Sequence, residues 1–355
     1  MGINITETKD CWDVLKETEL PVFMYGMGLG AEKILNIFEQ KGITCAGFFA
    51  SEGFVRGHYF KGHLVHTLRE IEEKVDDFIV VLAFAASYEP LYSTILDIGK
   101  RHTLIAPDVP VAGDGLFTYE YFRENRDKFE EVYDLLADDT SRKTYENIIN
   151  FKISGNPKYL DLCTSPREEV YGSIVDLKDG EVFVDLGAYK GDTATEFVRA
   201  CEEKGVKYGM IHAVEPNRKN YEKLKKNTED FNIRCYNAAA YDTSGKVNFT
   251  SNEGRMARIS SKGDDLIDTI SVDDITDNAT IIKLDVEGAE YQAIEGASKN
   301  IGNGAQVMCA LYHRNEDMFK LPLQIHELAP ELKLYVRHEL YIPAWETNLY
   351  AVREK

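Results

Sequence analysis

The stretch Val182-Phe183-Val184-Asp185-Leu186-Gly187-Ala188-Tyr189-Lys190-Gly191-Asp192-Thr193 decides the fold of the C-terminal half of this 355-residue chain. Three of its first four residues are apolar and predict a buried strand. Gly187 and Gly191 let the backbone turn tightly and approach a ligand closely. A helix predicted from Thr193 to Lys204 points its free N–H groups at the same place. This strand, glycine turn and helix predict the first unit of an open α/β sheet.

The same alternation of strands and helices continues to the C-terminus. Further strands are predicted at Ile211–Val214, Ile233–Asn237, Ile281–Leu284 and Gln306–Leu311. A shorter antiparallel pair is predicted at Val247–Thr250 and Ala257–Ser260, and a closing antiparallel hairpin at Leu334–His338 and Asn348–Arg353. Parallel strands with helices on both faces form a doubly wound α/β sheet.

A second unit of this kind precedes it. The apolar run Val22–Tyr25 enters Gly26-Met27-Gly28-Leu29-Gly30-Ala31, which fits the pattern G-x-G-x-x-A, and Glu52 follows the next strand, predicted at Ile43–Phe49. Strands are also predicted at Asp77–Ala86 and Leu104–Pro107. We therefore predict two doubly wound Rossmann-like domains, at residues 1–112 and 173–355, joined by a helical connector at 113–172.

Composition narrows the classes of partner. The net charge of −19 opposes contact with phosphate backbones and anionic lipids, so we expect neither a nucleic-acid nor a membrane partner. The longest apolar run, Phe78–Ala86, is too short to cross a bilayer. Six cysteines form no C-x-x-C pair, and no basic start with an apolar run opens the chain. These features predict a cytoplasmic protein in a reducing compartment.

The glycine turn predicts a binding site for an adenosine-bearing donor. Asp185 ends a strand, where its carboxylate can pair with the ammonium group of a methionine moiety and favour a sulfonium. Glu215 ends the next strand and can accept hydrogen bonds from two ribose hydroxyls. An acid in place of the first fingerprint glycine argues against NAD, and Lys190, without a following Ser or Thr, argues against a P-loop. We predict S-adenosylmethionine as the cofactor.

The residues predicted to contact this cofactor lie on four segments. They are Asp185, Gly187, Ala188, Gly191, Asp192, Thr193, Glu215, Pro216, Asn237, Ala238 and Asp285.

Catalysis is predicted at the acidic turn that follows the strand Ile281–Leu284. Asp285 and Glu287 could act as a general base, hold a substrate hydroxyl or bind a divalent cation, whereas helix capping is the structural alternative for Glu287. His313 follows the next strand, Gln306–Leu311, and should face the same crevice, where it could take a proton from a hydroxyl; a structural histidine is the alternative. No set of metal ligands is assigned. Acceptor contacts are predicted for Tyr171, Arg258, Arg314 and His338.

Several segments together resemble the FkbM-type methyltransferases. They are Phe183–Ala188, Ala213–Asn217, Asn237–Ala240, Thr269–Asp274, Ile282–Glu290 and Trp345–Ala351. The resemblance extends over roughly residues 115–355, and Lys283-Leu284-Asp285-Val286-Glu287-Gly288-Ala289-Glu290 is its most specific part; Tyr189 departs from the Asn common in the family. The resemblance implies a class I methyltransferase sheet, S-adenosylmethionine as the donor and O-methylation of a sugar or polyketide-like hydroxyl.

Three functions remain open at this point. We favour methyl transfer by in-line displacement to a small-molecule or glycan acceptor. The alternatives are an NAD(P)-dependent or nucleotide-sugar-binding oxidoreductase centred on residues 1–112, and a non-catalytic nucleotide-sensing module. The N-terminal domain resembles the small Rossmann-like modules of sugar-modifying enzymes, and we favour a scaffold that shapes the acceptor site or a homodimer over a bound dinucleotide.

Overall fold

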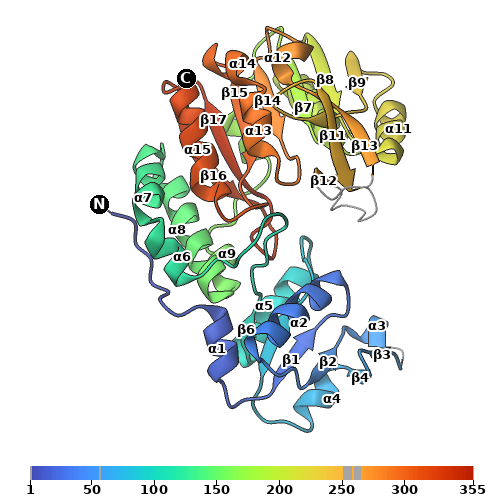
Figure 1. Cartoon of the computed structure of the whole chain (residues 1–355), viewed down its shortest axis with the longest axis vertical. Coiled ribbons are helices and arrows are strands. Elements are labelled where there is room, and N and C mark those ends of the chain that lie inside the picture. The colour runs from blue at the N-terminus through green and yellow to red at the C-terminus, as the bar shows by residue number, and fades with distance from the viewer. Residues whose placement is uncertain (1, 56, 251–257, 260–264, 355) are drawn as a thin grey trace.

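The computed structural model describes residues 2–55, 57–250, 258–259 and 265–354. An N-terminal α/β unit and a C-terminal α/β unit lie at opposite ends of the molecule, with a group of helices on one side between them (Figure 1). This mixed α/β architecture with two Rossmann-like sheets confirms the predicted fold class.

The N-terminal sheet has six strands in the order β3-β4-β2-β1-β5-β6. Its strands are β1 (Val22–Tyr25), β2 (Gly47–Phe49), β3 (Tyr59–Phe60), β4 (His63–His66), β5 (Ile79–Leu82) and β6 (Thr103–Ile105). Its helices are α1 (Cys11–Glu17), α2 (Leu29–Lys41), α3 (Glu52–Val55), α4 (Leu68–Glu72) and α5 (Leu91–Arg101). All pairs are parallel except β3 with β4. β2 is shorter than the predicted strand Ile43–Phe49, because only Gly47–Phe49 pairs with β1.

The connector is helical, as predicted. It contains α6 (Tyr119–Glu124), α7 (Arg126–Leu135), α8 (Asp139–Ser154), α9 (Lys158–Asp161) and a π-helical turn η1 (Val170–Ile174). Asp138 caps α8 by accepting a hydrogen bond from the Ser141 backbone N–H at 2.7 Å. The buried face of α8 includes Ile148, Ile149 and Phe151, so this helix is the core of the connector.

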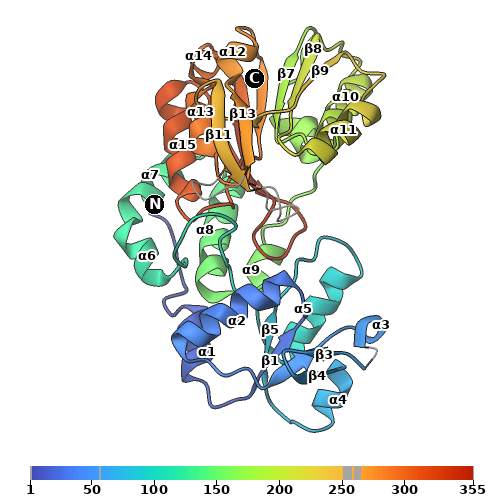
Figure 2. The same cartoon turned by 45° about the vertical axis from the view of Figure 1, so that its right-hand side comes forward.

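The C-terminal sheet has seven strands in the order β16-β17-β15-β14-β7-β8-β9. Its strands are β7 (Val182–Leu186), β8 (Met210–Val214), β9 (Ile233–Tyr236), β14 (Ile281–Leu284), β15 (Gln306–Ala310), β16 (Lys333–His338) and β17 (Thr347–Val352). Its helices are α10 (Asp192–Lys204), α11 (Arg218–Asn227), α12 (Val272–Ile275), α13 (Glu290–Glu295), α14 (Ser298–Gly302) and α15 (Asp317–Leu328). Only the pairs of β17 with β15 and β16 are antiparallel, which places the predicted closing hairpin at one edge. Figure 2 shows α10 and α11 on one flank and α13 to α15 on the other.

A small second sheet accompanies this domain, in the order β10-β13-β11-β12. It contains β10 (Ala239–Ala240), β11 (Gly245–Thr250), β12 (Arg258–Ile259) and β13 (Asp265–Ile270). β11 and β12 are antiparallel, in line with the predicted inserted pair, although the rest of the predicted strand Ala257–Ser260 lies outside the described residues. The partner strand β13 was missed because its sequence, Asp-Leu-Ile-Asp-Thr-Ile, alternates weakly.

The N-terminal unit contacts the C-terminal sheet through loops. Ala86, after β5, exchanges two backbone hydrogen bonds of 2.8 Å with Ile342, in the loop between β16 and β17. The Ala112 N–H donates to the His313 carbonyl at 2.9 Å. Asp108 and Lys152 form a buried ion pair between the end of the N-terminal unit and α8. These polar contacts add to one hydrophobic cluster that runs through both units and the connector and includes Tyr25, Phe129 and Val184.

Candidate active site

The glycine turn after β7 is held against the end of β14. Gly187 has φ +81°, and a Cβ built on it would lie 1.9 Å from the Asp285 carbonyl oxygen. Gly191 has φ +89° and precedes α10 as its N-cap, where a Cβ would lie 2.7 Å from Cγ2 of Thr228. Both positions therefore require glycine, for backbone conformation and for space. The turn brings the N-terminus of α10, with Asp192 and Thr193, to the carboxyl edge of the sheet.

Asp185 lies at the end of β7 with its side chain fully buried. Neither carboxylate oxygen has a hydrogen-bond partner, and Nζ of Lys283 stands 3.7 Å from Oδ1. Burial raises the pKa of Asp185 to about 6, partly offset by the charge of Lys283. A buried carboxylate that the protein leaves without a hydrogen bond is costly unless a ligand supplies the donor. An ammonium group is such a donor.

Glu215 follows β8 and lies beside the glycine turn. Its Oε2 accepts the Tyr189 backbone N–H at 3.0 Å, and its Oε1 accepts the Asn217 N–H at 2.9 Å. Burial raises the pKa of Glu215 to about 7. Tyr189 has φ +47°, so the turn is held in a conformation that few side chains adopt. Glu215 thus joins the two turns between which an adenosine ribose is expected.

The remaining predicted cofactor residues shape these turns. Nδ2 of Asn237 donates to the carbonyls of Glu215 and Pro216 at 2.9 and 3.0 Å, so Asn237 fixes the loop that carries Glu215. Ala188 and Ala238 are buried, and the Ala188 N–H donates to the Val214 carbonyl at 3.0 Å. Small residues here keep the edge of the sheet open. The Asp185 carboxylate without a hydrogen-bond partner, the glycine turn and Glu215 fit S-adenosylmethionine in donor type and charge.

Asp285, after β14, is surrounded by donors. Its Oδ2 lies 3.3 Å from Nζ of Lys283, and its Oδ1 accepts the Tyr312 hydroxyl at 3.2 Å. Burial opposes ionisation of Asp285, but the charges of Lys283 and His313 outweigh it and lower the pKa. Asp285 is therefore an ionised acceptor at neutral pH. Its weak basicity suits the orientation of a hydroxyl better than removal of its proton.

Of the two carboxylates in the acidic turn, Glu287 has the pKa better suited to a general base. Burial raises its pKa to about 7, although the charge of His313 opposes the shift. It has φ +55°, an uncommon conformation for a residue other than glycine. A pKa near the working pH gives the most effective proton acceptor. Strain of this kind concentrates at functional sites.

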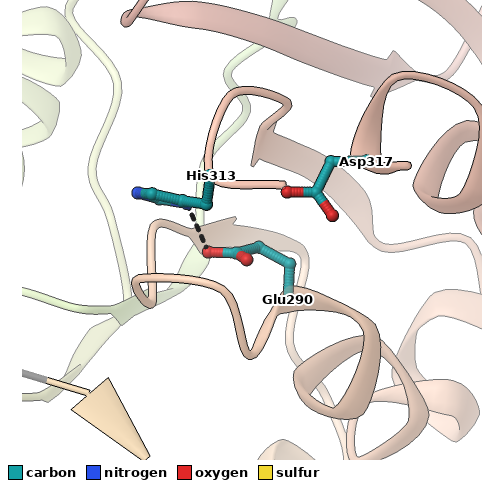
Figure 3. Close-up of side chains that lie close together, drawn as sticks. All are labelled: Glu290, His313 and Asp317. Carbon is teal, nitrogen blue, oxygen red and sulfur yellow. Dashed lines mark ion pairs between the residues drawn. The ribbon is translucent and has the colours of Figure 1, made fainter. Parts of the chain in front are cut away.

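His313 is buried, and Figure 3 shows its side chain close to those of Glu290 and Asp317. Its Nδ1 forms an ion pair of 2.9 Å with Oε1 of Glu290, and its Nε2 stands 3.4 Å from Oδ1 of Asp285 and 3.7 Å from Oε2 of Glu287. Burial lowers the pKa of His313, but Glu290 and the other carboxylates more than reverse this and raise it to about 10. The geometry therefore favours a cationic His313 that holds the carboxylates, in place of the proton acceptor we predicted.

Glu290, His313 and Asp317 come closest, among the described residues, to a set of metal ligands, because one ligand atom of each lies within 4.8 Å of the others. Glu290 also accepts the Val286 N–H at 2.8 Å, and Asp317 accepts the Arg314 N–H at 2.7 Å. Burial and the charge of Glu290 raise the pKa of Asp317 to about 8. Glu290 and Asp317 each accept a backbone N–H from the loop that precedes their helix, and Glu290 also pairs with His313.

A cleft opens beside Asp285, between η1, α10 and the loop that joins β16 to β17. Its walls include two cations and five carboxylates: Arg167, Lys283, Asp192, Glu196, Asp285, Glu339 and Glu346. Uncharged residues of the wall include Tyr171, Thr193, Met308, Asn348 and Tyr350. Tyr171, predicted as an acceptor contact, thus lines the cleft.

The other predicted acceptor residues lie elsewhere. Nε of Arg314 donates to the Gly288 carbonyl at 2.8 Å, so Arg314 fixes the acidic turn. His338 is fully buried, its ring nitrogens lie 3.0 Å from the Thr347 hydroxyl and the Tyr341 carbonyl, and burial lowers its pKa to about 4. This geometry assigns His338 a structural role. The side chain of Arg258 lies outside the described residues.

Sequence reasoning missed Arg167, Glu196 and Glu339 in the cleft. Arg167 pairs with Glu196 at 2.7 Å and with Glu339 at 3.0 Å, and 172 positions separate Arg167 from Glu339. Their neighbours carry no local motif, so only the fold brings them together. Glu346 lies in the segment Trp345–Ala351 that carried part of the family resemblance, which was the one available signal.

Known proteins that are similar to this chain include methyltransferases. Residues 185–342 match the family model described as the methyltransferase FkbM domain. The crystal structure of methyltransferase FkbM from Methylobacillus flagellatus KT is similar over 96% of this chain and 92% of that chain, with a TM-score of 0.72 and 20% identity. An rRNA methylase from Streptococcus thermophilus aligns with 53% of this chain and 93% of its own, with a TM-score of 0.34 and 10% identity. No curated protein matches the chain.

Within the described ranges, no helix is both long enough and apolar enough to span a bilayer.

Proposed function

Because the C-terminal domain belongs to the FkbM methyltransferase family, we propose that this methyltransferase uses S-adenosylmethionine to methylate a hydroxyl of a sugar, glycan or natural-product acceptor. The observation that carries the proposal is Asp185, a fully buried carboxylate without a hydrogen-bond partner beside a glycine turn. Glu215 supplies the second contact, toward the ribose. Both are placed at the carboxyl edge, where open α/β sheets bind ligands.

The protein's own residues account for the remaining steps. Asp285 orients the acceptor hydroxyl, and Glu287 accepts its proton as the oxygen attacks. His313, paired with Glu290, holds both carboxylates in place and limits their mutual repulsion. The bound cofactor supplies the methyl group for an in-line displacement, and positioning of the two reactants provides much of the rate.

The proposal is tested by binding and turnover measured separately. We expect S-adenosylmethionine and S-adenosylhomocysteine to raise the melting temperature, whereas NAD and nucleotide sugars should not. In a methyl-transfer assay on a panel of sugars and nucleotide sugars, Asp285→Asn should lower turnover by about 10²-fold or more while changing donor affinity less. A shift with NAD alone, or methylation of amines or carbons only, would contradict the proposal.

A further inference from the structure

The walls of the cleft carry more negative than positive charge. Five carboxylates and two cations face it. Arg167 already pairs with Glu196 at 2.7 Å and Glu339 at 3.0 Å, and Lys283 lies 3.3 Å from Asp285. Neither cation is therefore free to bind an anion. Negative charge remains even after a donor with one net positive charge has bound.

Glu346 and Asp192 are the two carboxylates in this wall that form no ion pair within the described residues, and Asp192 begins α10 in the predicted donor site. No Lys, Arg or His nitrogen lies within 4.0 Å of Glu346 in the described part of the chain, although it lines the same cleft as Lys283 and Asp285. Burial and the charge of Asp285 both raise its pKa, partly offset by Lys283. A partly desolvated carboxylate of this kind gains most from a cationic partner that arrives with a ligand.

The backbone also holds Glu346 in an uncommon conformation, with φ +59°. The loop that carries it is fixed at Ile342 by the two hydrogen bonds to Ala86 of the N-terminal unit. Thr347, the next residue, donates its hydroxyl to the Ala344 carbonyl at 2.7 Å, which closes the turn around Glu346. The carboxylate is thus held at the cleft by a braced, strained turn, a feature that concentrates at ligand sites.

We propose that the acceptor is an amino sugar or similar polyhydroxylated amine, whose ammonium group binds Glu346 close to the hydroxyl that is methylated. This inference rests on the proposed function and narrows its acceptor class. A phosphorylated or uronic acceptor meets Glu339, Glu346 and Asp285 without a free cation and is excluded by repulsion. The N-terminal unit contributes by bracing the loop that carries Glu346.

The experiment compares matched saccharides on protein saturated with S-adenosylhomocysteine. Tetramers of glucosamine, N-acetylglucosamine and galacturonic acid offer a cation, a neutral amide and an anion on similar rings. We expect the glucosamine tetramer to bind at least about tenfold more tightly than the galacturonate tetramer, as expected for one partly buried ion pair. Glu346→Gln should remove most of this preference.

The control is Glu229→Gln, which removes the same charge from an exposed position outside the cleft. It should keep the full preference, which separates binding at Glu346 from general attraction to an acidic protein. Equal binding of the anionic tetramer, or an unchanged preference in Glu346→Gln, overturns the inference. A tenfold loss of S-adenosylhomocysteine affinity in Glu346→Gln also overturns it, because Glu346 would then serve the donor. Failure of the unmodified protein to bind S-adenosylhomocysteine at all would refute the proposed function itself.

Discussion

Replacement of Asp185 by Asn should remove a pH-dependent destabilisation from the ligand-free protein while weakening donor binding. The pKa of this fully buried carboxyl is raised from 3.8 to about 6. One pKa unit corresponds to about 1.4 kcal/mol, so ionised Asp185 destabilises the folded protein by roughly 3 kcal/mol above pH 6. The penalty is absent below the unfolded pKa, near 4, and grows between the two values. Asn removes the charge with little change of shape.

The assay is urea unfolding of both proteins at several pH values. The unfolding free energy of Asp185→Asn relative to the unmodified protein should rise by about 2 kcal/mol between pH 4.5 and pH 7.5. The Asn amide has unmet hydrogen bonds of its own, which cost about 1–3 kcal/mol at every pH. This cost lowers the unfolding free energy of the variant equally at all pH values and does not change how that free energy varies with pH. Calorimetry at pH 7.5 should show weaker S-adenosylhomocysteine binding. A relative stability that is independent of pH would refute the reasoning.

Three further predictions test other parts of the molecule. Gly187→Ala should destabilise the C-terminal domain by about 2–4 kcal/mol in urea unfolding, because φ is positive and the new Cβ would lie 1.9 Å from the Asp285 carbonyl oxygen. The control Gly205→Ala also has positive φ but open space around it, and it should cost about 1–2 kcal/mol. Equal losses in the two variants would disprove the steric part of the argument. If Glu287 is the base, kcat/KM should rise with pH through about 7 as its carboxyl ionises, and Glu287→Gln should abolish this limb of the profile. Lys152→Met leaves Asp108 buried without a partner and should lower the free energy of unfolding by about 3–5 kcal/mol. The double variant with Asp108→Leu should recover much of this loss, and no recovery would show that the loss does not come from the unpaired Asp108 carboxylate.

The fold was largely predictable because it depends on local patterns. Apolar runs marked most of the parallel strands, and glycines marked the turns that must approach a neighbouring strand. The edge hairpin of Tyr59–Phe60 and His63–His66 was missed, because two strands of two and four residues around Lys61 and Gly62 give too short an alternation.

The site was predictable only in part, and the reason is physical. Asp185, Glu215 and Asp285 follow strands, so strand order places them at one edge. The protonation of His313 depends on Glu290, Asp285 and Glu287, which approach it only in three dimensions. A protonation state that depends on several neighbours in space cannot be predicted from the position of one residue in the sequence.

The two hydrogen bonds between Ala86 and Ile342 involve backbone atoms alone. Side chains in the loop between β16 and β17 can therefore change through evolution while the loop keeps its attachment to the N-terminal unit. New acceptor preferences could then arise from substitutions in this loop alone, without changes in either sheet. A chimera that exchanges this loop between related enzymes should retain folding if residues 83–90 are exchanged with it.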